Sequence, residues 1–165
     1  MNLAIDIGNS FTHFAVFEGR KNIYVQNCSS FGLTALTKAI KKIRKEFEII
    51  KIGISSVSPN TQKSIKLLIR KEFKASPLII NDKSKLPIKI KIKNPHSLGP
   101  DRICNAVFGY NAVKGKSNVL IIDLGTANTY DLVLKNGDFI GGIIAPGIMT
   151  SSTALNSNTG KLPLL

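Results

Sequence analysis

Cysteine, acidic residues and long apolar runs are all scarce in this chain of 165 residues. Its two cysteines, Cys28 and Cys104, are too few for a disulfide framework and lack metal-ligand spacing, so we interpret them as reduced thiols. No apolar run approaches the ~18 residues of a membrane span, and the first six residues contain no charged leader. These absences argue against a disulfide-rich secreted scaffold and a membrane protein, and they predict a cytoplasmic location.

Acidic residues number only 10 against 23 lysines and arginines, a balance that by itself suggests a polyanionic partner. Residues 38–93 hold 16 of the basic residues and four of the acidic ones, so this stretch carries almost all of the net charge of +13. Lysine outnumbers arginine 19 to 4, whereas base-edge and bidentate phosphate recognition favour arginine. We therefore interpret the basic stretch as a solvated lysine-rich face, with a nucleic-acid surface as the alternative.

Hydrophobic residues make up 43% of the chain, which is enough for a packed core. Apolar spacing and short apolar runs predict helices at 33–47 and from 58 onward, and strands at 2–7, 11–17, 49–57 and 78–80. Residues 88–93 alternate isoleucine and lysine, which is typical of a half-buried edge strand. Pro100 suits the first position of a further helix. This order of elements predicts an α/β fold with helices packed on a sheet.

A weak internal repeat relates the two ends of the chain at an offset of 117 residues. Asp6 matches Asp123 and Gly8 matches Gly125. The first aspartate and glycine lie at the turn of one predicted hairpin, and the second aspartate and glycine lie at the turn of another. The other identities are Ile5 with Ile122, Thr12 with Thr129, and Val16 with Val133. The repeat therefore predicts two hairpins of one design, the second formed by strands at 119–123 and 128–134.

Each Asp-x-Gly turn has a composition suited to phosphate binding. A glycine at a strand end lets the backbone approach an anion, and successive N–H groups there form an anion-binding nest. Asn9 or Thr126 adds a short donor, and the aspartate can hold a cation that bridges to phosphate oxygens. Two such turns facing one another would cradle a nucleoside triphosphate. In the plainer interpretation, Gly8 and Gly125 only permit tight turns, which the aspartates cap.

Several motifs follow one another in a distinctive order: Asp6-Ile7-Gly8-Asn9-Ser10, Gly99-Pro100-Asp101-Arg102, Asp123-Leu124-Gly125-Thr126-Ala127, Asp131, and Gly141-Gly142-Ile143-Ile144-Ala145-Pro146-Gly147. Together they resemble the motifs of the type III pantothenate kinases, which belong to the actin, sugar-kinase and heat-shock ATPase superfamily. The resemblance runs over the whole chain. It implies two ribonuclease-H-like lobes, the first complete at 1–116 and the second partial at 117–165. Family members are longer, which implies that this chain is a fragment with little activity.

The resemblance implies transfer of the ATP γ-phosphate to pantothenate, giving 4′-phosphopantothenate in the first step of coenzyme A synthesis. It implies that Asp101 is the base that accepts the hydroxyl proton, and that Gly99, Pro100, Asp101 and Arg102 bind pantothenate. A carboxylate can accept such a proton, and a guanidinium can pair with the carboxylate of the substrate. The plainer interpretation is a helix-start acid, stabilised by the helix dipole, beside a surface arginine.

The same resemblance implies an ATP-binding loop formed by Asp6, Ile7, Gly8, Asn9, Ser10, Phe11, Thr12 and His13. In it, Asp6 would organise Mg²⁺ through water. Asp123 would bind a monovalent cation, K⁺ or NH₄⁺, and Thr126 would contact ATP. The resemblance also implies a homodimer.

Other motif residues keep two interpretations. Asp131 belongs either to a polar pocket or to the support of the hairpin. The glycines of 141–147 either allow close backbone packing near the cleft or are plain turn residues. His13 and His96 have no partners at ligand spacing, so we assign neither to a metal.

Two positions depart from the family pattern. Ser10 stands where members usually have threonine, and Ile92 stands where many have a tyrosine that lines the pantothenate site.

Two other functions stay open. A non-catalytic regulatory or nucleic-acid-associated protein on the same fold is the first alternative. A phosphotransferase or phosphatase of the same superfamily, acting on exopolyphosphate or a sugar, is the second.

Overall fold

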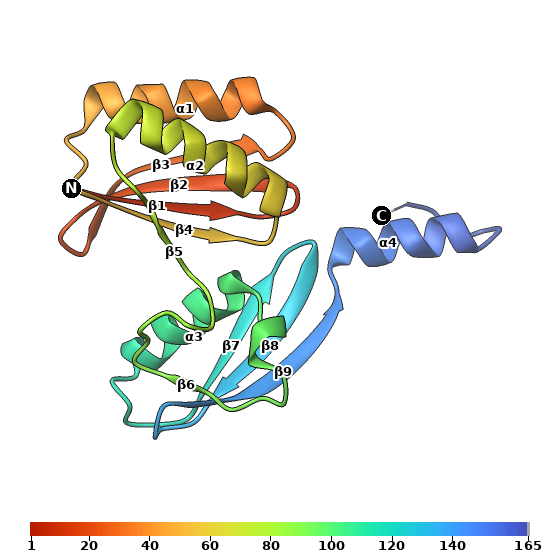
Figure 1. Ribbon diagram of the computed structural model, residues 1–165. Helices are drawn as coiled ribbons and strands as arrows, with labels where there is room; N and C mark the ends of the chain where they lie inside the picture. The colour runs from red at the N-terminus through yellow and green to blue at the C-terminus, as the bar shows by residue number, and fades with distance from the viewer. Residues whose placement is uncertain (165) are drawn as a thin grey trace. The chain divides into compact units, whose positions relative to one another are not determined.

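The structure is a computed structural model that describes residues 1–164. These residues form two compact units, each built on its own sheet (Figure 1). The first unit comprises Met1–Ser84 with Gly99–Asp101, and the second comprises Lys85–Leu98 and the residues from Arg102 onward. A lobe boundary at residue 116 stays a prediction, because contacts group most of the segment from 85 to 116 with the second unit. Within residues 1–164, no helix combines the length and the hydrophobicity that a membrane span requires.

The first unit is a five-stranded sheet with two helices. Its elements are β1 (Asn2–Ile7), β2 (Phe11–Glu18), β3 (Lys21–Ser29), α1 (Leu33–Glu46), β4 (Lys51–Ser56), α2 (Pro59–Phe73) and β5 (Leu78–Ile79). The strand order is β3-β2-β1-β4-β5. Strand β1 pairs antiparallel with β2 and parallel with β4, so the predicted hairpin continues into an α/β sheet.

Both helices of this unit lie on the same face of the sheet (Figure 1). The helical spacing predicted at 33–47 is confirmed by α1, and Pro59 occupies the first turn of α2 as expected. Helix residues such as Ile40 and Ile65 meet Leu3, Ile5 and Ile7 of β1 in one buried cluster. This cluster is the hydrophobic core of the first unit.

Strand β3 was not predicted from the sequence. It forms an edge of the sheet, pairs antiparallel with β2, and none of its residues is fully buried. An edge strand with polar residues on both faces has no clear apolar alternation, because little of it faces the core. The residue that follows β3, Ser30, contacts the first Asp-x-Gly turn, so this strand helps to position the candidate site.

The second unit is a four-stranded sheet of order β6-β9-β8-β7. Its elements are β6 (Lys89–Ile90), a short 3₁₀ turn (Pro95–Ser97), α3 (Pro100–Ala112), β7 (Val119–Leu124), β8 (Ala127–Val133), β9 (Asp138–Pro146) and α4 (Ile148–Asn158). The first two residues of α3 group with the first unit. Strand β6 is shorter than the predicted strand at 88–93, although the predicted alternation persists at its start, where Ile88 is buried and Lys89 is exposed. Strands β7 and β8 form the predicted second hairpin, and Pro100 begins α3 as expected.

Helix α3 packs closely on one face of this sheet. A Cβ atom at Gly109 would lie only 2.7 Å from Ile121 of β7, so the absence of a side chain allows the helix to approach. The opposite face carries Leu120, Ile122 and Leu124, which are 58%, 53% and 68% exposed. Their repeat partners Leu3, Ile5 and Ile7 are at most 2% exposed under α1 and α2. The second sheet therefore has an apolar face without a helical layer among the described residues.

The residue matches of the repeat agree with the structure on the first strand of each hairpin but not on the second strand. Ile7 pairs with Thr12, whereas its counterpart Leu124 pairs with Asn128, so the second turn is one residue shorter. The predicted match of Thr12 with Thr129 is therefore wrong in structural terms, as is that of Val16 with Val133. A shift of one residue places a strand side chain on the other face of the sheet.

Candidate functional site

The first Asp-x-Gly turn joins β1 to β2 through residues 8–11. The Gly8 N–H donates to the Phe11 carbonyl at 3.0 Å, and a Cβ at Gly8 would lie 2.9 Å from that same oxygen. The turn is therefore tight enough to favour glycine. Asn9 and Phe11 are exposed at its tip. An exposed, glycine-containing backbone turn is the geometry in which N–H groups can meet an anion.

Ser30, directly after β3, holds this turn in place. Its hydroxyl donates to the Gly8 carbonyl at 2.8 Å and lies 2.9 Å from the hydroxyl of Thr12, and its N–H donates to the Ser10 carbonyl at 2.9 Å. Thr12 is fully buried, so its side chain supports the turn from within the unit. Sequence reasoning missed Ser30 because it missed β3.

His13 follows on the opposite face of β2. Its Nδ1 lies 2.8 Å from Oδ1 of Asn27 on β3, in an exposed hydrogen bond. Asp6 is in register with His13, so both side chains share the face of the sheet that α1 and α2 do not cover.

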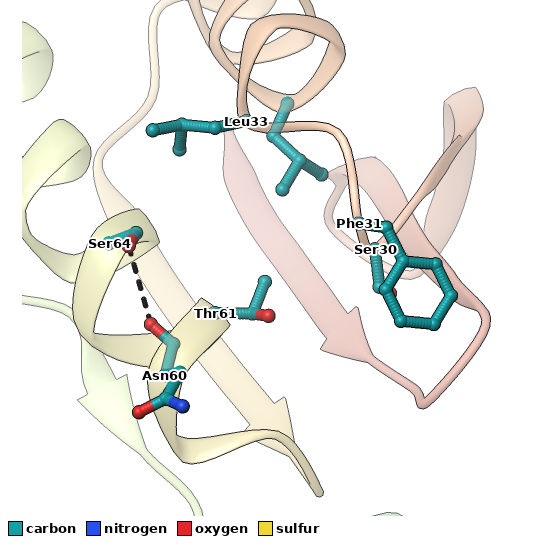
Figure 2. A pocket seen from close by; sticks show the side chains of 7 residues that line it. Ser30, Phe31, Leu33, Asn60, Thr61 and Ser64 are labelled. Carbon is teal, nitrogen blue, oxygen red and sulfur yellow. Dashed lines mark hydrogen bonds between the residues drawn. The ribbon is translucent and has the colours of Figure 1, made fainter.

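A small cavity adjoins the same support. It has a volume of about 200 Å³ and is lined by residues at the end of β3 and in the first turns of α1 and α2, as Figure 2 shows for Ser30, Phe31, Leu33, Asn60, Thr61 and Ser64. Small-molecule pockets usually measure about 300–1,000 Å³. None of the predicted site residues lines it, and we assign it no ligand.

The Gly-Pro-Asp-Arg motif lies at the start of α3. Asp101 is in the first turn, where a carboxylate is stabilised by the helix dipole. A Cβ at residue 99 would lie 2.4 Å from Oδ1 of Asp101. Gly99 is thus the residue that lets this carboxylate fold back beside the backbone.

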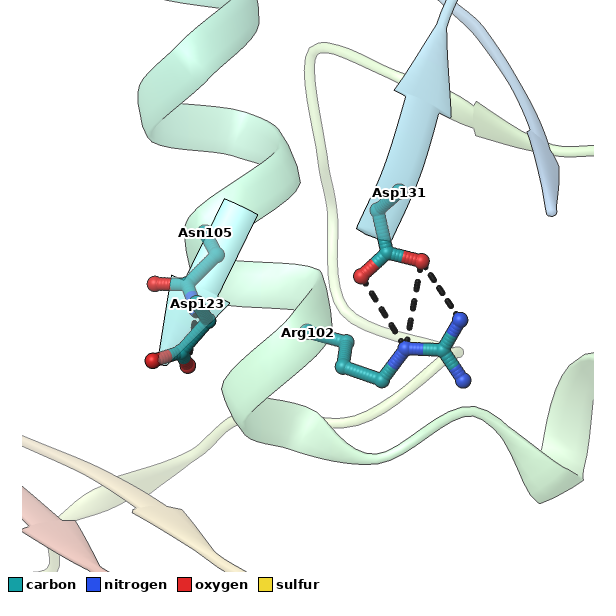
Figure 3. A network of polar contacts seen from close by, with 4 residues as sticks. All are labelled: Arg102, Asn105, Asp123 and Asp131. Atoms are coloured by element: carbon teal, nitrogen blue, oxygen red, sulfur yellow. Dashed lines mark hydrogen bonds and ion pairs between the residues drawn. The ribbon is translucent and has the colours of Figure 1, made fainter. Parts of the chain in front are cut away.

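Arg102 is not the surface arginine of the plainer interpretation. Its guanidinium forms an ion pair with Asp131 of β8, with Nε 3.0 Å from Oδ2 and Nη2 2.5 Å from Oδ1 (Figure 3). The side chain of Asp131 is only 1% exposed and that of Arg102 is 15% exposed. Asp131 therefore supports the motif by fixing Arg102 against the second hairpin.

Gly142 makes room for this ion pair. A Cβ there would lie 2.2 Å from the Tyr130 carbonyl, 2.3 Å from Asp131 and 3.0 Å from Arg102. Of the two interpretations of this glycine, close packing is the one that the distances support.

Asp123, the acid of the second turn, is also held by α3. Asn105 donates through Nδ2 to Oδ2 of Asp123 at 2.8 Å (Figure 3). Arg102 and Asn105 are three residues apart, so they share one face of the helix. Sequence reasoning missed Asn105, although this spacing from Arg102 was a readable signal.

The second turn is held by the start of α4. The Thr126 carbonyl accepts from the Gly147 N–H at 3.0 Å and from the Thr150 hydroxyl at 2.7 Å. A Cβ at Gly147 would lie 1.9 Å from the Gly125 carbonyl, which no side chain can do without moving the backbone. Gly125 and Thr126 thus depend on a glycine more than 20 residues further along the chain.

The predicted residues therefore form two groups. Asp6 through His13 surround the first turn in the first unit, and Arg102, Asp123, Thr126 and Asp131 surround α3 and the second hairpin in the second unit. A cradle formed jointly by the two turns and Asp101 stays a prediction.

Solved structures with a similar fold come from several protein families. A Ppx/GppA phosphatase from Aquifex aeolicus matches with a TM-score of 0.55 and 12% identity over 97% of this chain and 56% of its own. The ethanolamine utilization protein EutJ from Carboxydothermus hydrogenoformans matches with a TM-score of 0.53 and 10% identity, over 98% of this chain and 57% of its own. These likenesses concern the fold alone. They confirm the α/β class and the two-lobe ribonuclease-H-like fold.

Sequence relatives are more specific. The chain is 33% identical to a type III pantothenate kinase from Myxococcus xanthus, over 99% of this chain and 66% of the relative. It is 36% identical to one from Agathobacter rectalis, over 99% of this chain and 65% of the relative. It thus spans a little under two thirds of the length of these curated relatives. The family model of the type III pantothenate kinases matches residues 2–165, and the chain belongs to that family.

Proposed function

We propose that this protein takes part in the transfer of the ATP γ-phosphate to pantothenate, giving 4′-phosphopantothenate on the route to coenzyme A. The observation that carries the proposal is the ion pair between Arg102 and Asp131, because it ties the Gly-Pro-Asp-Arg motif to the second hairpin. A substrate-binding arginine needs such an anchor, since a flexible guanidinium loses conformational entropy when it binds. Family membership supports the choice of reaction.

In this proposal Asp101 accepts the proton of the primary hydroxyl as the phosphoryl group arrives. Phosphoryl transfer asks a protein chiefly for positioning and for neutralisation of charge. The Gly99 and Pro100 backbone and Arg102 bind pantothenate, with the guanidinium directed to its carboxylate. The absence of a side chain at Gly99 keeps the Asp101 carboxylate close to the backbone of the motif.

ATP binds to the loop from Asp6 to His13 and to Thr126. The backbone N–H of Asn9 in the exposed turn contacts phosphate oxygens, while the Gly8 N–H stays bonded to the Phe11 carbonyl. Thr12 acts indirectly in this scheme, because its hydroxyl is buried against Ser30. Thr126 is placed by Gly147 and Thr150.

The donor groups around the two aspartates suit hard cations. Asp6 and Asp123 supply carboxylate oxygens, and neighbouring strands supply serine and threonine hydroxyls. Among the residues that the structure describes, no cluster of three or more His, Cys, Asp or Glu side chains could hold a metal ion. Asp6 would hold Mg²⁺ through water, and Asp123 would hold K⁺ or NH₄⁺. When bound, these ions neutralise charge on the phosphates.

The proposal also includes a cytoplasmic location, which the composition of the sequence predicts, and a homodimer, which the family resemblance implies. Sedimentation of the purified protein tests the dimer.

A substrate panel tests the reaction. The protein is assayed alone and as a fusion to the part of the Agathobacter rectalis relative that it does not cover, which we call the fused protein. ATP is combined with pantothenate, a hexose or polyphosphate, with Mg²⁺, and with K⁺ or Na⁺. We expect K⁺-dependent formation of 4′-phosphopantothenate by the fused protein and slow or absent turnover by the chain alone. Equal or preferred phosphorylation of the hexose would contradict the proposal.

A further inference from the structure

Among the described residues, two buried hydroxyls have no hydrogen-bond partner: Oγ of Ser55 and Oγ1 of Thr129. Each lies beside one acid of the internal repeat. Ser55 of β4 is in register with Asp6 of β1, and Thr129 of β8 is in register with Asp123 of β7. Residues directly opposite one another on neighbouring strands point to the same face of the sheet. The same pairing of an aspartate with an unpartnered hydroxyl therefore occurs in both units.

This coincidence needs a physical reason. Buried polar groups in proteins are nearly always hydrogen-bonded, because leaving one without a partner is unfavourable. Ser55 is only 7% exposed. Other serines of the same unit are satisfied, since Ser30 bonds to Gly8 and Ser56 bonds to Ser58. Within the described residues of the first unit, Ser55 is therefore the buried hydroxyl that lacks a protein partner.

The location of Ser55 suits a ligand. Asp6 and Ser55 lie near the carboxyl ends of the parallel strands β1 and β4. In open α/β sheets, ligands bind outside the carboxyl ends of the strands. A carboxylate and a hydroxyl on one face offer the oxygen donors that a hard cation or its bound water prefers.

We propose that Ser55 is a positioning residue of the Asp6 turn, whose hydroxyl holds, together with the Asp6 carboxylate, the water shell of a divalent cation. Thr129 is likewise in register with Asp123 in the second unit, but it lies on the antiparallel neighbour β8, whereas Ser55 lies on the parallel neighbour β4. The purpose of the cation rests on the proposed function, but its binding is measured without turnover.

Mn²⁺ is the probe, because it broadens the NMR signals of nuclei near it. Titration into the ¹⁵N-labelled 165-residue chain should broaden the amide signals of residues 6–8 and 54–56 first. Asp6→Asn should abolish this selective broadening. Ser55→Ala should weaken the apparent Mn²⁺ affinity by about three- to tenfold, the effect of one lost hydrogen bond. Ser64→Ala is the matched control, because its hydroxyl bonds to the Asn60 carbonyl within α2, and it should leave the affinity unchanged.

Three results would overturn the proposal. The first is the absence of selective broadening in the unsubstituted chain. The second is an unchanged Mn²⁺ affinity in Ser55→Ala with a higher melting temperature, which means that the hydroxyl is merely unsatisfied. The third is an unchanged affinity with a lower melting temperature, which means that Ser55 holds a structural water only. A chain that binds Mn²⁺ through Asp6 and Ser55 while the fused protein fails to phosphorylate pantothenate would refute the proposed function alone.

Discussion

Ile5 and Ile122 occupy the same position in two copies of one hairpin, yet Ile5 is 2% exposed and Ile122 is 53% exposed. Each lies one residue before the aspartate of its turn, on the face opposite that carboxylate. In the first unit this face is covered by α1 and α2. In the second unit α3 covers the other face, the one that carries Asp123 and Asp131.

This contrast predicts unequal effects of one substitution. Ile5→Ala should lower the free energy of unfolding by about 2–5 kcal/mol, because it leaves a cavity in a packed core. Ile122→Ala should change it by no more than about 0.5 kcal/mol, because the side chain is already largely hydrated in this chain. Urea unfolding of the two variants measures both values. Equal losses would mean that the face around Ile122 is covered in solution.

Breaking the ion pair of Arg102 and Asp131 should be costly for stability. Asp131→Asn should lower the free energy of unfolding by about 3–5 kcal/mol, because it leaves a largely buried guanidinium without its counter-charge. The double variant Arg102→Met with Asp131→Leu should recover most of this loss, since an apolar pair of similar volume avoids the desolvation of two charges. Thermal unfolding measures the recovery.

The same double variant distinguishes a structural role of Arg102 from a role in binding pantothenate. If Arg102 binds the substrate carboxylate, the recovered protein stays unable to bind pantothenate. Recovery of stability together with normal pantothenate binding in the fused protein would show that Arg102 has a structural role only.

Gly147 should tolerate no side chain. Gly147→Ala places a Cβ against the Gly125 carbonyl and should destabilise the second unit by about 1–3 kcal/mol through overpacking. Gly160→Ala is the control, since a Cβ there meets nothing within 4 Å. Amide chemical shifts of residues 125–127 should move in the first variant and not in the second. Unmoved shifts in Gly147→Ala would contradict the close approach.

Ser30, directly after β3, should stabilise the first turn. Ser30→Ala removes the hydroxyl that meets both the Gly8 carbonyl and Thr12, and it leaves the buried Thr12 hydroxyl short of a partner. We expect a loss of about 1–3 kcal/mol in stability and faster hydrogen exchange at residues 8–11. Ser29→Ala, which removes only an exposed acceptor for the Phe31 N–H, should do neither.

Much of the fold was readable from the sequence because its signals are local. The apolar spacing from Leu33 onward predicts α1, and Pro100 marks the start of α3. Strand β3 was not predicted, because it is an edge strand in which no residue is fully buried. The register of the second hairpin was not predicted, because its turn is one residue shorter and every later residue match with the first hairpin shifts by one. The identity of Thr12 and Thr129 in the sequence hid this shift.

The candidate site also combines residues that the sequence identifies with residues that only the structure identifies. Asp6, Asp101 and Asp123 carry motifs and could be named from sequence. Their supports could not, because Ser30, Asn105 and Thr150 act through contacts that form only when separate elements pack together. Asp131 was recognisable as a motif residue, but its role needed the position of Arg102.

The role of Asp101 is the central claim, and it is tested most directly by the rate of 4′-phosphopantothenate formation in the fused protein with and without Asp101→Asn. Asp138→Asn is the control, because its carboxylate lies at the start of β9 and accepts a hydrogen bond from Asn136 in the second unit. The predicted result is a loss of at least about 100-fold in Asp101→Asn, the scale of a missing general base, with normal folding and a normal rate in the control. A full rate in Asp101→Asn would contradict the claim.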